Sequence, residues 1–189
     1  MPILHAPILE QAGFVSGALE PVKNYVARSD GVSQYWELSE PVNILPNDVI
    51  RFGLSKFTDV GAFRRFFGSS DFTFSLDSGA DGDKFRLRRV TDGLINGETI
   101  TSDVTLIPTT GSNDVEVVSG EIRSISTLLS LGTTNLASAA MYEFRVIRNG
   151  TVIHEIPLTN RSQGATQLAT VGNVNATMVG YNPDVWEEV

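Results

Sequence analysis

The sequence predicts an all-β protein built from antiparallel strands, and three observations support this prediction. Short segments alternate apolar and polar residues, as half-buried strands do. Turn residues such as glycine, asparagine and aspartate recur between these segments at intervals of about ten residues, the spacing of a sandwich or barrel. Helical periodicity is nearly absent. Together these features favour an antiparallel β-sandwich or barrel.

The individual strands are predicted where the alternation is clearest. In segment 71–76, Phe72, Phe74 and Leu76 share one face, and in 84–90 Phe85 and Leu87 alternate with arginines. The other predicted strands are 48–56, 103–107, 114–118 and 120–125.

A β-hairpin is predicted over 141–156. Its first strand places Tyr142, Phe144 and Val146 on one face, and Asn149-Gly150 supplies the two positive φ angles of a type I′ turn. We expect loops at 78–83, 91–93, 96–97 and 109–113. We expect one short helix within 126–140.

Composition excludes several classes of protein. A chain of 189 residues fits one domain with its own core. The absence of cysteine excludes disulfides, zinc–thiolate sites and a thiol nucleophile. A net charge of −8 argues against nucleic-acid binding, and no apolar run is long enough to span a membrane. The first residues lack the basic and apolar regions of a secretory signal.

Residues 1–22 are predicted to form an extended N-terminal arm that precedes a domain at 23–189. The segment contains three prolines among scattered apolar side chains. We expect it to pack against a neighbouring subunit rather than its own domain. The candidate assembly residues are Ile3, Leu4, Ile8, Leu9 and Phe14.

The sequence offers little for catalysis, so we expect no enzyme, no catalytic residue and no cofactor. The E-x-D-x-x-E string of jelly-roll glucanases is absent, as are the G-x-S-x-G elbow and glycine-rich phosphate loops. His5 and His154 are the only histidines, and His154 is expected to be an exposed strand residue. A glycan-cleaving enzyme built from unmarked carboxylates remains the alternative.

Segment 77–83 raises the question of a calcium site, since it gathers three aspartates around glycines. The EF-hand spacing fails, because Gly79 and Arg88 occupy ligand positions. We therefore expect a hairpin loop and no metal, with calcium as the open alternative.

Carbohydrate is the most plausible small ligand, because sugars are held by aromatic faces flanked by polar side chains. Trp36 and Leu38 are predicted to lie in the core, with Tyr35 exposed on the opposite face. For the C-terminal residues the alternative is a tail packed on the sandwich, and Phe63, Phe66 and Phe67 are expected in the core or an interface. The candidate carbohydrate-binding residues are Asp30, Tyr35, Tyr181, Asn182 and Trp186.

Several segments carry a family resemblance. DGVSQYWEL (30–38), LPNDVIRF (45–52) and segment 142–158 resemble strands of concanavalin A-like, laminin G-like domains. Segments 157–164 and 181–186 resemble the ends of such domains in bacteriophage virion proteins. The resemblance covers the chain from about Tyr25 to its end. It implies an antiparallel jelly-roll β-sandwich.

The resemblance also implies a function. We expect a non-enzymatic virion structural protein, of the capsid decoration or tail-fibre type, made in the host cytoplasm. Its expected partners are other virion proteins and further copies of itself, for example in a trimer, with no nucleic acid and no membrane. The alternative is a lectin module that binds cell-surface carbohydrate for host recognition.

Overall fold

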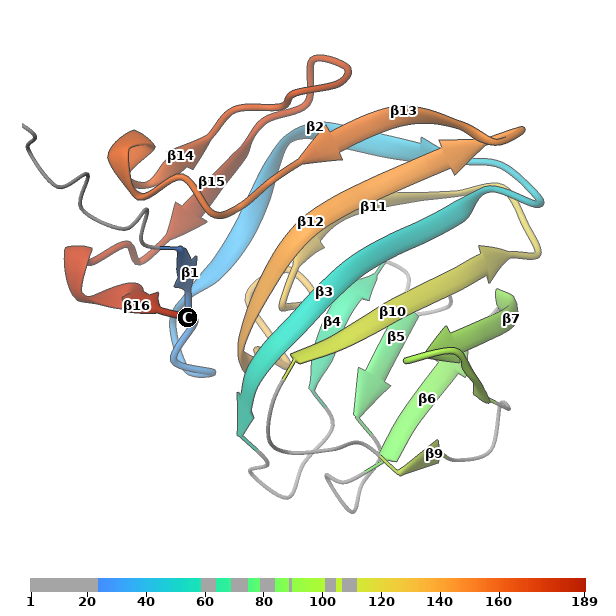
Figure 1. Ribbon diagram of the computed structural model, residues 1–189, viewed down its shortest axis with the longest axis horizontal. Helices are drawn as coiled ribbons and strands as arrows, with labels where there is room; N and C mark the ends of the chain where they lie inside the picture. The colour runs from blue at the N-terminus through green and yellow to red at the C-terminus, as the bar shows by residue number, and fades with distance from the viewer. Residues whose placement is uncertain are drawn as a thin grey trace, which may run out of the picture.

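The computed structural model describes residues 24–58, 64–68, 75–78, 84–88, 90–100, 105–106 and 112–189. Within these ranges the protein is all-β, with two antiparallel sheets, a two-stranded ribbon and no α-helix (Figure 1), so the predicted all-β class with antiparallel strands is confirmed. Two 3-10 turns occur there, η1 (Arg161–Gln163) and η2 (Pro183–Val185). Over the same residues no helix has the length and apolar character to cross a membrane.

The described strands form two larger sheets and a ribbon. The six-stranded sheet has the order β13 (Thr151–Ile156), β12 (Ser138–Arg148), β3 (Val49–Thr58), β10 (Ser112–Ser119), β7 (Val90–Ile95) and β8 (Glu98–Ile100). The eight-stranded sheet has the order β14 (Thr166–Gln167), β15 (Ala176–Val179), β2 (Tyr35–Ile44), β11 (Arg123–Leu128), β4 (Arg65–Gly68), β5 (Ser75–Ser78), β6 (Lys84–Arg88) and β9 (Thr105–Leu106). The ribbon pairs β1 (Tyr25–Ala27) with β16 (Trp186–Glu188).

The two sheets pack face to face around one apolar core, which makes the fold a β-sandwich. Phe52 on β3 meets Phe67 on β4 edge to face, with ring centroids 6.0 Å apart. Trp36 and Leu38 of β2 lie in the same core, as predicted. Burying each large apolar side chain stabilises the fold by about 1.5–3 kcal/mol relative to exposure.

The predicted hairpin is confirmed. Asn149 and Gly150 have φ angles of 50° and 76°, and Arg148 pairs with Thr151 across the turn. A second turn of this kind, Asn96-Gly97, joins β7 to β8. Both turns need positive φ at two successive residues, which asparagine and glycine adopt at low cost.

A β-bulge corrects the predicted face of β12. Met141 and Phe144 are both buried. They are three residues apart, and in a regular strand residues at an odd spacing point to opposite faces. The register with β3 shifts between Tyr142 and Arg145, and Glu143 has a φ of 53°. This extra residue reverses the alternation, so Tyr142 lies on the outer face and not beside Phe144 and Val146.

Three other predictions are corrected. No helix forms within 126–140, because β11 continues to Leu128 and the residues from Leu129 to Ala137 connect it to β12. Residues 91–93, expected as a loop, lie in β7, where Gly93 pairs with Val117. The strand expected at 120–125 begins only at Arg123. In each case pairing with a distant strand overrides local turn or helix preference.

The remaining predicted strands agree with the structure wherever it describes them. Segments 48–56, 84–90, 103–107 and 114–118 overlap β3, β6, β9 and β10, and the end of 71–76 overlaps β5. The predicted arm at 1–22 and residues 79–83 and 109–111 lie outside the described residues.

An ion pair between buried Asp48 and partly exposed Arg148 connects the two sheets at one corner. Asp48, 2 % exposed, follows the turn between β2 and β3. Its carboxylate accepts hydrogen bonds from Nε and Nη2 of Arg148 (2.9 and 2.7 Å) and from the amide of Leu45 (2.8 Å). Arg148 also donates to the carbonyl of Asn43 (3.2 Å). This network ties the end of β12 to the end of β2.

The pKa of the Asp48 carboxyl is lowered from its ordinary value of 3.8. Burial raises this pKa. The hydrogen bonds from Arg148 and from the Leu45 amide, together with the charge of Arg148, lower the pKa by a larger amount. Because the folded-state pKa lies below the unfolded one, the ionised carboxylate stabilises the fold above about pH 4. That contribution is lost as the pH falls through the lowered folded-state pKa.

We predict that Asp48→Asn lowers the free energy of unfolding by about 2 kcal/mol at pH 7, because it removes a charge-assisted bond from Arg148. The variant also loses less stability than the wild type between pH 5 and pH 2, for the reason above. Urea unfolding at several pH values measures both effects. Asp184→Asn, on an exposed residue, is the control. An unchanged pH dependence of stability in Asp48→Asn would contradict this assignment.

Candidate functional site

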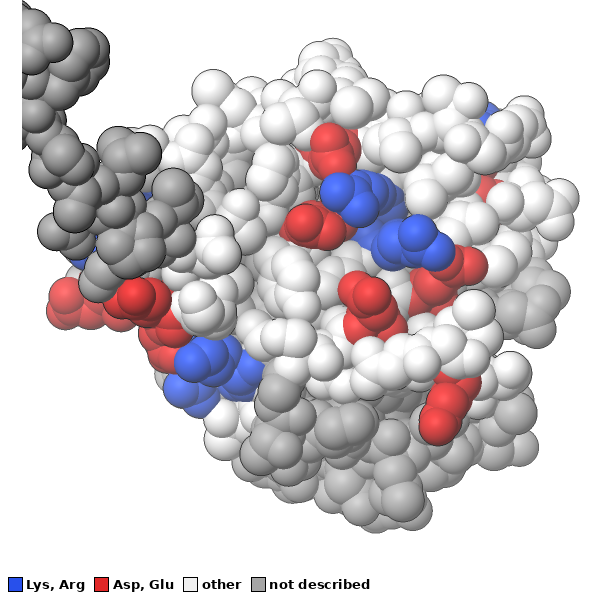
Figure 2. All heavy atoms as spheres, viewed as in Figure 1, with Lys and Arg blue, Asp and Glu red and all other residues white. Residues whose placement is uncertain are grey.

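The outer face of the six-stranded sheet carries a row of charged residues set by strand register. Each residue lies directly opposite the next on the neighbouring strand. Figure 2 shows acidic and basic side chains gathered over β12, β3 and β10. From β7 to β13 the row is Leu94, Glu116, Arg51, Arg145 and Glu155.

Both arginines of this row are held by carboxylates. Nε of Arg51 donates to Oε2 of Glu116 at 3.0 Å, and its Nη2 contacts the same oxygen. Nε of Arg145 donates to Oε1 of Glu155 at 2.5 Å, and its Nη1 lies 3.5 Å from Oε2 of Glu143. Arg51 and Arg145 face each other across β3 and β12, so these pairs also offset their mutual repulsion.

The pKa values of Glu155 and Arg145 are both shifted in the direction that favours the charged form. Hydrogen bonds from the Thr170 hydroxyl and from Arg145 lower the pKa of Glu155 below its ordinary value. The hydrogen bond to Glu155 raises the pKa of Arg145. Both groups therefore stay ionised at neutral pH.

A second row lies one step further along the strands. It contains Asn96, Asp114, Gly53 and Tyr142, with Asp114 and Tyr142 both opposite Gly53. Oδ1 of Asn96 accepts a hydrogen bond from the amide of Asp114 at 2.8 Å. The carboxylate of Asp114 accepts no hydrogen bond from any residue that the structure describes.

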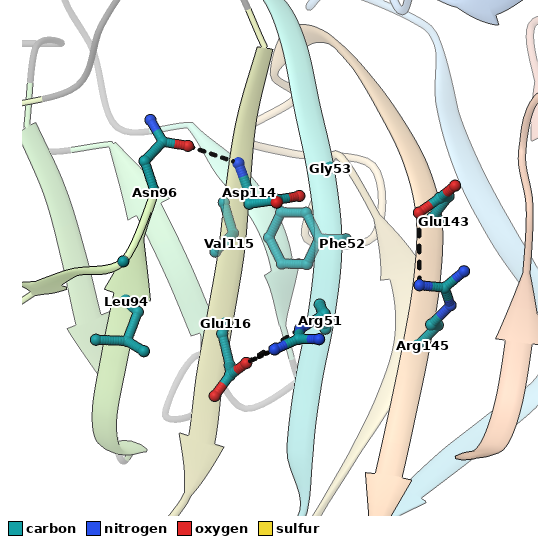
Figure 3. A pocket seen from close by; sticks show the side chains of 11 residues that line it. Arg51, Phe52, Gly53, Leu94, Asn96, Asp114, Val115, Glu116, Glu143 and Arg145 are labelled. Atoms are coloured by element: carbon teal, nitrogen blue, oxygen red, sulfur yellow. Dashed lines mark hydrogen bonds and ion pairs between the residues drawn. The ribbon is translucent and has the colours of Figure 1, made fainter.

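A cavity of about 520 Å³ lies over the two rows (Figure 3), and we call it the sheet hollow. The backbones of β3 and β10 form its floor. Its charged lining residues are Arg51, Asp114, Glu116, Glu143 and Arg145. Two of the three carboxylates are bound to arginine, so the hollow presents directed hydrogen-bonding groups to a ligand with many polar atoms.

The sequence signal for this site is the alternation of charge against apolar residues. Arg51 alternates with Ile50 and Phe52, and Asp114 and Glu116 alternate with Val115. Both strands are predicted from the sequence, but none of these side chains is predicted as part of a site. The signal is incomplete, because it does not show that the two strands are neighbours in this register.

Two predicted carbohydrate-binding residues lie around a different cavity, of about 340 Å³, which we call the end hollow. The Asp30 carboxylate accepts hydrogen bonds from the amides of Val32, Ser33 and Gln34. Burial raises the Asp30 pKa, but these bonds outweigh it and the pKa is lowered. Oδ1 of Asn182 accepts from the amide of Asp184 at 3.1 Å. Both side chains thus stabilise local turns.

The other three predicted residues are part of the packing. Tyr35 is 7 % exposed, so the expectation of an exposed Tyr35 is wrong. The chain after β15 returns beside it, where Nε2 of Gln34 donates to the carbonyl of Gly180. Trp186 is 8 % exposed, and its Nε1 donates to the hydroxyl of Tyr181 at 3.2 Å. The C-terminal tail therefore packs on the sandwich, which is the alternative to a carbohydrate site that was given for these residues.

The remaining candidates give no second site. The arm residues Ile3, Leu4, Ile8, Leu9 and Phe14, and Phe63, lie outside the described residues, whereas Phe66 and Phe67 are in the core. Of segment 77–83, Asp77 and Ser78 belong to β5 and the rest is not described. No group of three or more potential metal ligands occurs among the residues that were described.

His154 on β13 is half-buried, so the expectation of an exposed His154 is wrong. Burial lowers its pKa below the ordinary 6.5, and the charge of Arg148 lowers it further, while Glu40 acts in the opposite direction. Its Nδ1 has no hydrogen-bond partner within the described part of the chain. A general base needs an oriented partner and a nucleophile, and neither is found at His154 there.

We predict that the Arg51–Glu116 pair contributes little stability, because both side chains are partly exposed. A double-mutant cycle with Arg51→Ala and Glu116→Ala should give a coupling energy of about 0.5 kcal/mol. The coupling should fall as sodium chloride is added, since salt screens exposed charges. Urea unfolding measures it without adding ions. A coupling that salt leaves unchanged would show that the pair is more shielded than this geometry implies.

Comparison with known proteins adds no assignment: no family model, curated protein or solved structure matches this chain.

Proposed function

We propose that this chain is a non-enzymatic carbohydrate-binding domain, and that the sheet hollow is its binding site. The supporting observation is the Asp114 carboxylate, which accepts no hydrogen bond from the described residues and lies among arginine–glutamate pairs on a cavity floor. A carboxylate can accept hydrogen bonds from two adjacent hydroxyl groups, and guanidinium groups donate to ring and hydroxyl oxygens. Sugars carry these groups at high density.

The strand order favours a jelly roll as the finer description of the sandwich. Strands β2 and β3 follow each other in the chain but lie in opposite sheets. β2 lies between β15 and β11, and β3 lies between β12 and β10. The chain crosses between the two sheets from β2 to β3, from β3 to β4, and at each step from β9 to β12, as jelly-roll strands do.

Display on a bacteriophage particle is the second part of the proposal, and the sequence resemblance supports it. The amide of Val189 donates to the carbonyl of Asn24 at 3.0 Å, so the described region starts and finishes at one corner. Attachment through that corner would leave the sheet hollow accessible, because none of its lining residues belongs to the β1–β16 ribbon. A host-surface glycan is the partner that this arrangement suits.

Glycan cleavage is the less favoured alternative. A glycosidase needs one protonated carboxyl and one carboxylate across the scissile bond. Glu116 and Glu143 both lie in ion pairs with arginine, so neither carboxyl is set as a proton donor across a bound sugar. Release of reducing sugar by the purified protein, abolished by Glu116→Gln or Asp114→Asn, would replace the binding proposal with an enzyme.

The proposal is tested by glycan-array screening of the full chain, followed by calorimetry with the glycan found. We predict that Asp114→Asn lowers affinity about tenfold or more, because it replaces charge-assisted hydrogen bonds with neutral ones. Asp184→Asn, the same substitution outside the sheet hollow, should leave affinity unchanged. An array without binding, or equal loss in both variants, would sink the proposal.

A further inference from the structure

A second cavity adjoins the sheet hollow on the same face. It measures about 610 Å³ and lies beside the β1–β16 ribbon, so we call it the ribbon hollow. Its lining includes Ser55 of β3, Tyr142 of β12 and Asn160. Glu143 lines both cavities. The two hollows therefore meet at the bulge of β12.

Tyr142 lies between the two hollows, with its ring against the backbone of β3. A Cβ atom on Gly53 would sit 2.0 Å from Cε2 and 2.1 Å from Cζ of this ring. Distances this short to three adjacent ring atoms place that point over the ring face and not beyond its edge. Only glycine leaves room for this packing. One face of the ring covers Gly53, and the opposite face is turned away from the sheet.

The floor of the ribbon hollow holds a polar group without a partner. Ser55 is 4 % exposed, and its hydroxyl makes no hydrogen bond within the described residues. A buried, unpaired hydroxyl costs free energy, and a ligand hydroxyl would recover it once the atoms that cover the Ser55 oxygen move aside. This observation is independent of the charges in the sheet hollow, and it points to a polar ligand at the other side of Tyr142.

We propose that the two hollows form one groove for an oligosaccharide of at least two sugar rings, with one ring stacked on Tyr142. This inference rests on the proposed carbohydrate binding and extends it. Arg51 and Ser55 mark the two hollows and are four residues apart on β3, about 13 Å along a strand. That span exceeds a single pyranose ring. An aromatic face in the middle of a polar groove suits the apolar face of such a ring.

The charge of the groove narrows the class of sugar. Three carboxylates and two guanidinium groups line the sheet hollow, and both guanidinium groups are already paired. The Asp114 carboxylate forms no ion pair with an arginine or lysine in the described part of the chain, so it repels uronic and sialic acids. The groove therefore takes a neutral or amino-sugar chain.

Calorimetry with the full chain tests the groove, using cello- and chito-oligosaccharides of one to six rings as probes. We predict at least tenfold tighter binding of a trisaccharide than of the monosaccharide in the series that binds. Tyr142→Leu keeps an apolar cover on Gly53 but has no aromatic face, so it should weaken trisaccharide binding about tenfold. Tyr142→Phe should bind like the wild type, and thermal unfolding confirms that each variant is folded.

The outcomes separate the groove from the proposed function. Equal affinity for one and three rings, or unchanged binding by Tyr142→Leu, overturns the groove; if Asp114→Asn still weakens binding, the carbohydrate site in the sheet hollow stands. Tighter binding of oligogalacturonates than of neutral chains overturns the assigned class of sugar. A wild-type protein that binds none of the glycans on the array or in the series overturns both proposals.

Discussion

The register that β3 keeps with β10 and β12 decides both the core and the surface of this protein. Side chains alternate along a strand, so a slip of one residue would exchange the buried and exposed sets. In the observed register Phe52 faces the opposite sheet, while Arg51 meets Glu116 on one side and Arg145 on the other. The same pairing that buries the apolar residues therefore assembles the charged row of the sheet hollow.

The bulge at Glu143 connects this register to the candidate groove. A regular β12 would carry Tyr142 and Phe144 on one face, and both would compete for space between the sheets. The positive φ of Glu143 absorbs one residue, which leaves Phe144 in the core and places Tyr142 over Gly53. Bulges often re-aim a side chain next to a binding site. Here the bulge is also where the two hollows meet.

The charged side chains of the sheet hollow are already paired with one another. Arg51 and Arg145 each donate a hydrogen bond to a carboxylate on a neighbouring strand. A ligand that meets preorganised groups loses less free energy to ordering side chains. The Asp48–Arg148 network serves the same end at the corner of the sandwich, because it joins the ends of β2 and β12. The ion pair at this corner is thus separate from the ion pairs of the proposed binding site.

The sequence by itself determined the all-β class, the Asn-Gly turns and the burial of Trp36, because alternation and turn chemistry act between residues that are close in the chain. The tertiary structure alone decided which strands are neighbours. That pairing buried Tyr35, placed Trp186 beside Ala27, and replaced the helix expected within 126–140 with two strand ends joined by an irregular turn. It also placed the charged side chains of β3, β10 and β12 in one row. Such contacts join residues far apart in sequence, and local preference carries no information about their register.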